Sequence, residues 1–508
     1  MRRLVPLLLA LALSACFRAH PPTPRPTFAA LADALFDSVE AEGTLVGALV
    51  IDARTESLLY ARREHARLLP ASTMKVVSTA AALSALGPDF RFRTPVWLEG
   101  TQLGAVFEGD LVVEASGDPS LGSWRFPETS GVCAQVADAL IARGVQRWRG
   151  GLRVEGAGGP GVSLGPGWAW DDAAYAYSAP PTRFVFRENT AELRLERFGG
   201  ASCGAPVSVA LVPSAGETEA VVSLETTAAR AGLGCVREWG ADRLRCVWRS
   251  TSPEQCPRST STRIAVHEPQ KPFAMCVEQA LAARGVTRDF AIAIALEPTV
   301  QAPIPARELL VEIVSPTLAE LVRVTNKESL NLYAERLALR FAQERTGEES
   351  YRALAEAMAQ ELERRGIARN DLSVADGSGL SRYNLATARG MVRLLKTSLD
   401  EPYGRALIES LPIAGVDGTL TRSPVTSAAG LVYAKTGTLS GQKAFVGIAD
   451  RPGDAAHPRV LFALLLGNQS SEPALHANEV FARFADALVV ATVERRGSSV
   501  ESVGSEGR

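Results

Sequence analysis

The segment Leu69-Pro70-Ala71-Ser72-Thr73-Met74-Lys75-Val76-Val77 carries the strongest structural signal in the chain. Small and apolar residues continue to position 86 with the spacing of a buried helix. On a helix, Ser72 and Lys75 share one face, where the amine can take the proton of the hydroxyl. A serine near the start of a helix also gains from the positive end of the helix dipole. The segment therefore predicts a helix that carries a nucleophile, Ser72, and its base, Lys75.

Lysine is scarce, which gives each lysine more weight. The 54 Lys and Arg residues include only Lys75, Lys271, Lys327, Lys396, Lys435 and Lys443 as lysines. Arginine keeps its proton near neutrality, so chemistry that needs a neutral amine must use lysine. Three of the six, Lys75, Lys327 and Lys435, lie in or beside the motifs described here.

Two further motifs each occur once. Ser329-Leu330-Asn331 lies between two helical stretches, and Lys435-Thr436-Gly437 ends the apolar run 431–434, which reads as a strand. A second Ser-x-x-Lys pair, Ser440 with Lys443, follows glycine-rich sequence where no helix is expected, so we interpret it as chance. The three remaining motifs follow one another along the chain as Ser-x-x-Lys, Ser-x-Asn and Lys-Thr-Gly. Each lies in the local structure that its chemistry requires.

Length and composition indicate the number of domains and the general class of the protein. The 508 residues predict about three domains, and the 46% hydrophobic content is that of a chain with a large core. A net charge of −2 excludes the basic excess of a nucleic-acid binder. Helical periodicity spans residues 28–42, 72–86, 132–143, 318–344, 351–365 and 474–493. Strand-like runs occupy 109–114, 207–212, 291–296, 431–436, 443–449 and 460–466, and residues 90–310 look largely β.

The N-terminus predicts export. Met1-Arg2-Arg3 precedes a short apolar run that ends Leu13-Ser14-Ala15-Cys16, which looks like a lipoprotein signal with Cys16 as the lipidated residue. We expect a signal at 1–16, a Pro-rich tether at 17–27 and a periplasmic protein anchored to a membrane through Cys16. The six other cysteines suggest structural disulfides, whose pairing the spacing leaves open: Cys133, Cys203, Cys235, Cys246, Cys256 and Cys276. No metal or cofactor site is expected.

The ordered motifs resemble those of serine penicillin-binding proteins and serine β-lactamases. Beyond them, Gly117-Asp118-Pro119-Ser120-Leu121, the run 167–172, Asp376-Gly377-Ser378-Gly379-Leu380-Ser381-Arg382 and the run 411–420 are similar to one group of these proteins. That group is the class C, low-molecular-mass penicillin-binding proteins, the D-alanyl-D-alanine carboxypeptidase/endopeptidase family. The likeness covers roughly residues 28–493.

The resemblance implies an α/β (α+β) fold, in which a serine β-lactamase/transpeptidase-like catalytic domain is interrupted by two nested, mostly β insert domains. We expect the catalytic domain at 28–85 and 305–494, insert domain II at 86–100 and 188–304, nested insert domain III at 101–187, and a disordered tail at 495–508.

The resemblance also implies the chemistry. Ser72 would form an acyl-enzyme with the penultimate D-Ala of a peptidoglycan stem or cross-link, with Lys75 as base, its pKa lowered by burial and by Lys435. Ser329 would relay a proton, and Asn331 would hold the substrate amide and order the lysine. The predicted substrate-binding residues are Thr436, Gly437, Thr438, Arg382, Asp172 and Tyr177. β-Lactams would be covalent inhibitors.

Two alternatives use the same motifs. A class A β-lactamase carries a Glu-x-x-Leu-Asn element, which the sequence lacks. A penicillin-binding wall sensor would acylate without turning over. The balance between carboxypeptidase and endopeptidase action stays open at this point.

Overall fold

The computed structural model describes most of the chain. It covers residues 26–157, 164–198, 207–212, 219–226, 231–238, 243–251, 258–288, 294–295, 307–450, 460–470, 473 and 475–501. The predicted signal, Cys16 and nearly all of the predicted tether therefore lie outside the described residues, as do Cys203 and Cys256. Within the described residues, no helix has both the length and the apolar character needed to cross a membrane.

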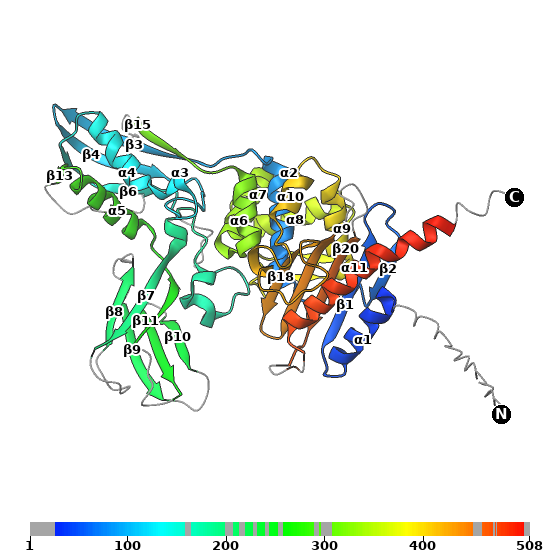
Figure 1. Cartoon of the computed structure of the whole chain (residues 1–508). Helices are drawn as coiled ribbons and strands as arrows, with labels where there is room; N and C mark the ends of the chain where they lie inside the picture. The colour runs from blue at the N-terminus through cyan, green and yellow to red at the C-terminus, as the bar shows by residue number, and fades with distance from the viewer. Residues whose placement is uncertain are drawn as a thin grey trace, which may run out of the picture.

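A five-stranded antiparallel sheet forms the centre of the larger body (Figure 1). Its strands, in spatial order, are β18 (Val432–Leu439), β19 (Gln442–Ala449), β20 (Val460–Gly467), β1 (Leu45–Asp52) and β2 (Leu58–Arg62). Every residue of β20 is buried, because helices cover both faces of the sheet. This is why residues 460–466 are continuously apolar rather than alternating.

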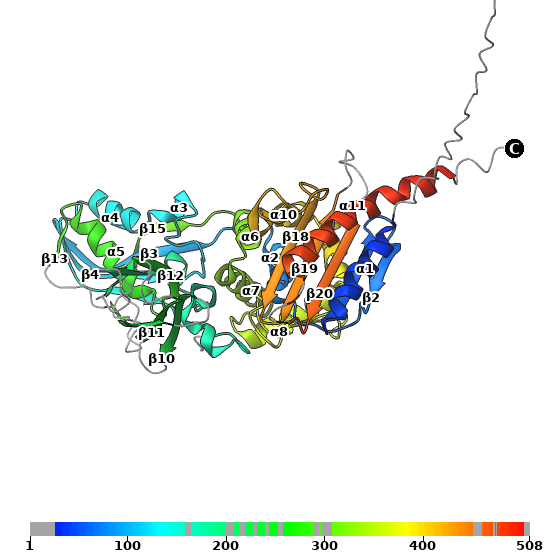
Figure 2. The same ribbon diagram turned by 60° about the horizontal axis from the view of Figure 1, so that its bottom comes forward.

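The two faces of the sheet carry separate cores. Phe462 and Leu464 point to the face covered by α1 (Phe28–Glu40) and α11 (Ala477–Glu501), whereas Leu461 and Ala463 point to the opposite face. Figure 2 shows α11 lying across the strands. The opposite face packs on α2 (Met74–Leu86), α7 (Asn331–Thr346), α8 (Tyr351–Arg364) and α9 (Ala388–Leu399). Next to these helices are α6 (Leu318–Glu328), α10 (Gly404–Ser410) and a small hairpin of β16 (Leu372–Ser373) and β17 (Leu385–Ala386).

Between α2 and α6 the chain forms a second sheet of seven strands. These are β3 (Arg93–Leu103), β4 (Val106–Glu114), β5 (Arg147–Arg149), β6 (Leu152–Glu155), β13 (Thr287–Arg288), β14 (Ile294–Ala295) and β15 (Arg307–Val314). A disulfide joins Cys133 on α4 (Val132–Ala142) to Cys276 on α5 (Gln270–Ala282). Short helix α3 (Pro127–Ser130) precedes α4. Strands β3 and β15, where the chain enters and leaves this region, pair antiparallel.

Two three-stranded sheets form a further body that is drawn in green in Figure 1. One contains β12 (Ser259–Ala265), β7 (Thr190–Arg197) and β8 (Val207–Val212). The other contains β10 (Gly232–Glu238), β11 (Arg243–Ser250) and β9 (Glu219–Thr226). Leu193, Leu244 and Trp248 form part of their shared core, and a disulfide joins Cys235 to Cys246.

The strand pairing leads us to propose insert boundaries that differ from those expected from the sequence. A boundary between residues 100 and 101 would cut β3, which continues to Leu103 and turns through residues 104–105 into its partner β4. Gly104 has a φ of 59°, which suits such a tight turn. We propose that the seven-stranded sheet is the outer insert and that residues 190–265 are nested within it. Helix α11 continues to Glu501, which lies within the range 495–508 that was expected to be a disordered tail, and residues 502–508 lie outside the described residues.

The aromatic cluster beneath α11 tests the packing of the central sheet. Phe445 is 1% exposed, and its ring centroid lies 4.9 Å from Phe481 and 5.1 Å from Phe462. We expect Phe445→Ala to lower the free energy of unfolding by about 3–5 kcal/mol, because it leaves a cavity that the sheet cannot close. Denaturant unfolding measures this change. Phe198→Ala, at a 57% exposed position, is the matched control, and equal losses in the two variants would contradict the packing argument.

Candidate active site

Ser72 lies in a short turn of 3-10 helix, Ala71–Thr73, that leads directly into α2. Two glycines pack against the backbone of this turn. A Cβ at Gly379 would lie 1.8 Å from the Ala71 carbonyl oxygen, and a Cβ at Gly437 would lie 2.6 Å from that of Pro70. Both distances are far below van der Waals contact, so only glycine permits this approach. The Ser72 turn is therefore held between the loop that contains Gly379 and strand β18.

Lys75 is 0% exposed, and its amine contacts three separate segments. Its Nζ lies 2.8 Å from Ser72 Oγ, 2.5 Å from Asn331 Oδ1 and 2.7 Å from the backbone oxygen of Ser378. The helical spacing of Ser72 and Lys75 thus produces the contact that the sequence predicted.

The environment of Lys75 suits a general base. Burial lowers its pKa to about 7, while the negative charges of Asp376 and Glu335 act in the opposite direction. A pKa near neutrality lets a large fraction of the amine be neutral at physiological pH. Lys435 was expected to lower the pKa of Lys75. The structure shows the opposite influence: burial, followed by the positive charge of Lys75, holds the pKa of Lys435 well below its usual range.

Ser329 and Asn331 lie where α6 ends and α7 begins. Ser329 adopts a left-handed conformation with a φ of 60° as the C-cap of α6, so the continuous helix suggested by the periodicity of 318–344 is interrupted here. Lys435 Nζ donates to Ser329 Oγ at 2.9 Å, and Asn331 Nδ2 donates to the Tyr177 carbonyl at 2.6 Å. The junction of the two helices thus places the Ser-x-Asn motif between Lys75 and Lys435.

A buried carboxylate pair holds the loop that supplies the Ser378 carbonyl. Glu335 accepts hydrogen bonds from the backbone N–H groups of Gly377 and Ser378, and Asp376 accepts them from those of Gly379 and Ser381. Burial, followed by the charge of Asp376, raises the pKa of Glu335. Sequence reasoning missed the role of Glu335. Its position four residues after Asn331, on the same helix face, was the available signal.

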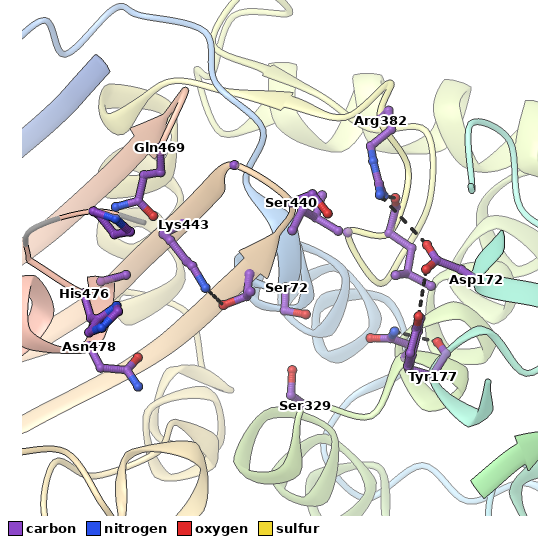
Figure 3. Close-up of a pocket in the computed structure, with 18 of the residues that line it drawn as sticks. Ser72, Asp172, Tyr177, Ser329, Arg382, Ser440, Lys443, Gln469, His476 and Asn478 are labelled. Atoms are coloured by element: carbon purple, nitrogen blue, oxygen red, sulfur yellow. Dashed lines mark hydrogen bonds and ion pairs between the residues drawn. The ribbon is translucent and has the colours of Figure 1, made fainter. Parts of the chain in front are cut away.

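These residues open into a cavity of about 980 Å³ (Figure 3). Its wall includes Ser72, Ser329, Asn331, Thr438, Arg382, Asp172 and Tyr177 from the predicted set. Thr436 and Gly437 are not among the described residues of the wall. Thr436 Oγ1 lies 3.1 Å from Thr419 Oγ1, and Gly437 packs beneath Ser72.

On one side of Ser72, three predicted residues form a polar group. Tyr177 donates its hydroxyl proton to Asp172 at 2.7 Å, and the Arg382 guanidinium lies 3.9 Å from the same carboxylate. Burial and then the Asp172 charge raise the pKa of Tyr177. Asp172 and Tyr177 come from the long excursion between α2 and α6, so that region contributes directly to the cavity.

The opposite side contains residues that sequence reasoning missed. Lys443, Gln469, His476 and Asn478 line it, as Figure 3 shows. Lys443 was set aside with Ser440 as a chance motif. The structure agrees that the pair is not helical, since β18 ends at Leu439 and β19 begins at Gln442, but this hairpin directs Lys443 into the cavity.

Fold and site together define a class. A serine next to a buried amine of lowered pKa, on a helix packed against an antiparallel sheet, is typical of serine hydrolases that act through an acyl-enzyme. A family model described as the D-Ala-D-Ala carboxypeptidase 3 (S13) family matches residues 27–488. The chain belongs to this family, which confirms the predicted family and the predicted class of enzyme.

Individual relatives support the same family assignment. A D-alanyl-D-alanine carboxypeptidase from an Actinomadura species is 31% identical over 435 residues, covering 83% of this chain and 78% of that protein. D-alanyl-D-alanine carboxypeptidase DacB from Haemophilus influenzae is 25% identical over 425 residues, covering 82% and 84%. The crystal structure of penicillin binding protein 4 (dacB) from H. influenzae matches with a TM-score of 0.76 at 23% identity, covering 90% of this chain and 98% of that one. This match confirms the predicted fold class.

The pKa of Lys75 predicts a pH dependence of acylation. The neutral amine is the reactive form, so acylation should become faster as the pH rises through about 7. Between pH 6 and pH 8 we expect the second-order rate constant for benzylpenicillin to increase about tenfold, and Lys75→Arg should abolish acylation because arginine keeps its proton. Stopped-flow or quench labelling between pH 6 and pH 8 measures this rate constant. A flat profile would contradict a base that titrates near neutrality.

The contact between Gly379 and Ala71 predicts a second effect. Gly379→Ala introduces a Cβ against the Ala71 carbonyl at a position with a φ of 88°, so the Ser72 turn must move. We expect acylation to slow at least about a hundredfold, since small displacements of a nucleophile are costly. Gly347→Ala is a suitable control, because it also has a positive φ, of 78°, but its Cβ would meet no atom within 4 Å. Similar acylation rates in the two variants would count against the contact.

Proposed function

We propose that this carboxypeptidase cleaves the terminal D-Ala-D-Ala bond of peptidoglycan stem peptides, and the corresponding D-Ala bond of cross-links, through an acyl-enzyme on Ser72. The observation that carries the proposal is the contact between Ser72 Oγ and the buried Lys75 amine at 2.8 Å. The family membership supports the substrate class.

In the first step, the neutral Lys75 amine takes the proton of Ser72, and Oγ attacks the carbonyl carbon of the penultimate D-Ala. The C–N bond then breaks, and the proton that Lys75 took from Ser72 passes through the Ser329 hydroxyl to the leaving amine. Lys435 supports this relay because its amine donates to Ser329 Oγ. Water finally hydrolyses the ester, releasing the shortened peptide and restoring the Ser72 hydroxyl.

The oxyanion that develops during attack needs preorganised donors. We assign this role to the backbone N–H groups of Ser72 and Thr438. The tight packing of Gly437, whose Cβ would lie 3.0 Å from the Ser72 nitrogen, supports the assignment because it keeps β18 next to the nucleophile.

Three sets of polar residues bind the substrate in this proposal. Asn331 holds the substrate amide while its Oδ1 orders Lys75. Asp172 meets the amine of a diaminopimelate side chain, with Tyr177 and Arg382 holding the carboxylate in position. Thr436 and Thr438 bind the terminal carboxylate.

The place of action follows from the substrate. We propose that the protein is exported to the periplasm and is tethered to a membrane through lipidated Cys16, with residues 17–27 as the spacer. Globomycin-sensitive processing and labelling of Cys16 by a fatty-acid analogue would test the anchor.

Ser72→Ala should abolish covalent labelling by a fluorescent penicillin and release of D-Ala from a stem pentapeptide. Ser440→Ala, which changes the other Ser-x-x-Lys serine in the same cavity wall, should keep the labelling. Gel fluorescence and mass spectrometry of the peptide products measure both activities. Labelling of the Ser72 variant at the wild-type level would refute the assignment.

The same experiment separates the alternatives. A wall sensor would be labelled but would release no D-Ala and cleave no cross-linked dimer. A β-lactamase would release hydrolysed penicillin quickly instead of retaining the acyl group.

A further inference from the structure

We propose that Lys443 binds the carboxylate of the leaving group, the D-amino acid whose nitrogen is released when Ser72 is acylated. The inference rests on the proposed function and adds a specificity-determining residue to it. In the proposed function, the hydroxyl groups of Thr436 and Thr438 on β18 bind the terminal carboxylate, and the predicted cation Arg382 lies on the other side of the cavity, beside Asp172.

The position of Lys443 follows from the strand register. Lys443 on β19 pairs with Thr438 on β18, and its Nζ donates to Thr438 Oγ1 at 3.3 Å. Gly437, the residue before Thr438, packs against the backbone of Ser72. The Lys443 amine thus reaches the side of the nucleophile that lies away from Asp172, as Figure 3 shows.

The other cations near Ser72 are already engaged. Lys435 is fully buried and donates to Ser329 Oγ and to the Thr436 carbonyl. Arg382 donates to the Leu380 carbonyl and is paired with Asp172. Among the ion pairs of the described residues, none involves Lys443. Within the described part of the cavity wall, Lys443 is therefore the cation whose charge is left for a ligand.

The surroundings of Lys443 strengthen the preference for an anion. Helix α11 begins at Ala477, and His476, Ala477 and Asn478 line the same side of the cavity. The first N–H groups of a helix lack intrahelical partners and carry partial positive charge. Burial lowers the pKa of Lys443, and a carboxylate bound beside it would favour the charged amine again.

The acyl part and the leaving group of the substrate lie on opposite sides of Ser72. If the acyl part lies toward Asp172, the leaving group lies toward Lys443. A carboxylate next to the released nitrogen is present both in terminal D-Ala and in the D-centre of a cross-linked diamino acid. One cation therefore serves carboxypeptidase and endopeptidase substrates alike, and the polar wall formed by Gln469 and Asn478 offers room for the larger leaving group.

The test compares two peptides that differ only at this carboxylate, one ending in D-Ala-D-Ala and the other in D-Ala-D-Ala amide. For Lys443→Met we expect kcat/KM on the free acid to fall about ten- to a hundredfold, mainly through KM, because a charge-assisted hydrogen bond is lost. Cleavage of the amide should stay within about twofold of wild type. Lys443→Arg should retain most of the preference for the acid.

Lys396→Met is the matched control, since Lys396 pairs with Asp400 outside the cavity. An equal loss of kcat/KM on the acid and the amide would overturn the proposal, because Lys443 would then only support Thr438. An unchanged kcat/KM on both peptides would also overturn it. A wild-type enzyme that cleaves neither peptide would instead refute the proposed function, so the two failures are distinguishable.

Discussion

The site depends on one buried amine. Lys75 is enclosed by Ser72, Asn331 and the Ser378 carbonyl, and the last two lie 256 and 303 residues further along the chain than Lys75. Removing a lysine from water is costly unless its charge is neutralised or its polar contacts are satisfied. The same desolvation lowers the pKa that the chemistry needs. The elements around α2 must therefore provide both a dry enclosure and oriented acceptors.

Close backbone packing provides that enclosure. Gly379 and Gly437 let a loop and a strand approach the Ser72 turn from different directions. Glu335 on α7 and Asp376 within the loop itself accept its backbone N–H groups, which fixes where the Ser378 carbonyl points. This network explains why two carboxylates are buried near a lysine that must lose its proton, although their charges oppose that loss.

The inserted region belongs to the site as well as to the fold. Its loop brings Asp172 and Tyr177 to the cavity, and the Tyr177 carbonyl accepts from Asn331. The sequence indicated the existence of the insertion through its change of texture, but the internal boundaries that we propose from the strand pairing differ from those expected from the sequence. Strand pairing between β3 and β15 joins residues more than two hundred positions apart, and periodicity within a short window carries no information about such pairing.

The sequence alone determined the chemistry that depends on spacing within one element. Ser72 and Lys75 were recognisable because residues three apart on a helix share a face. The motifs Ser329-Leu330-Asn331 and Lys435-Thr436-Gly437 were recognisable through their order along the chain and their resemblance to a known family. Only the tertiary structure decided the rest. Lys327 lies beside a motif, yet its amine pairs with Asp417. Lys443, dismissed from the sequence, lines the cavity because a hairpin turns it there. Contacts through backbone carbonyls and hairpin register depend on how distant segments pack, and no local pattern encodes them.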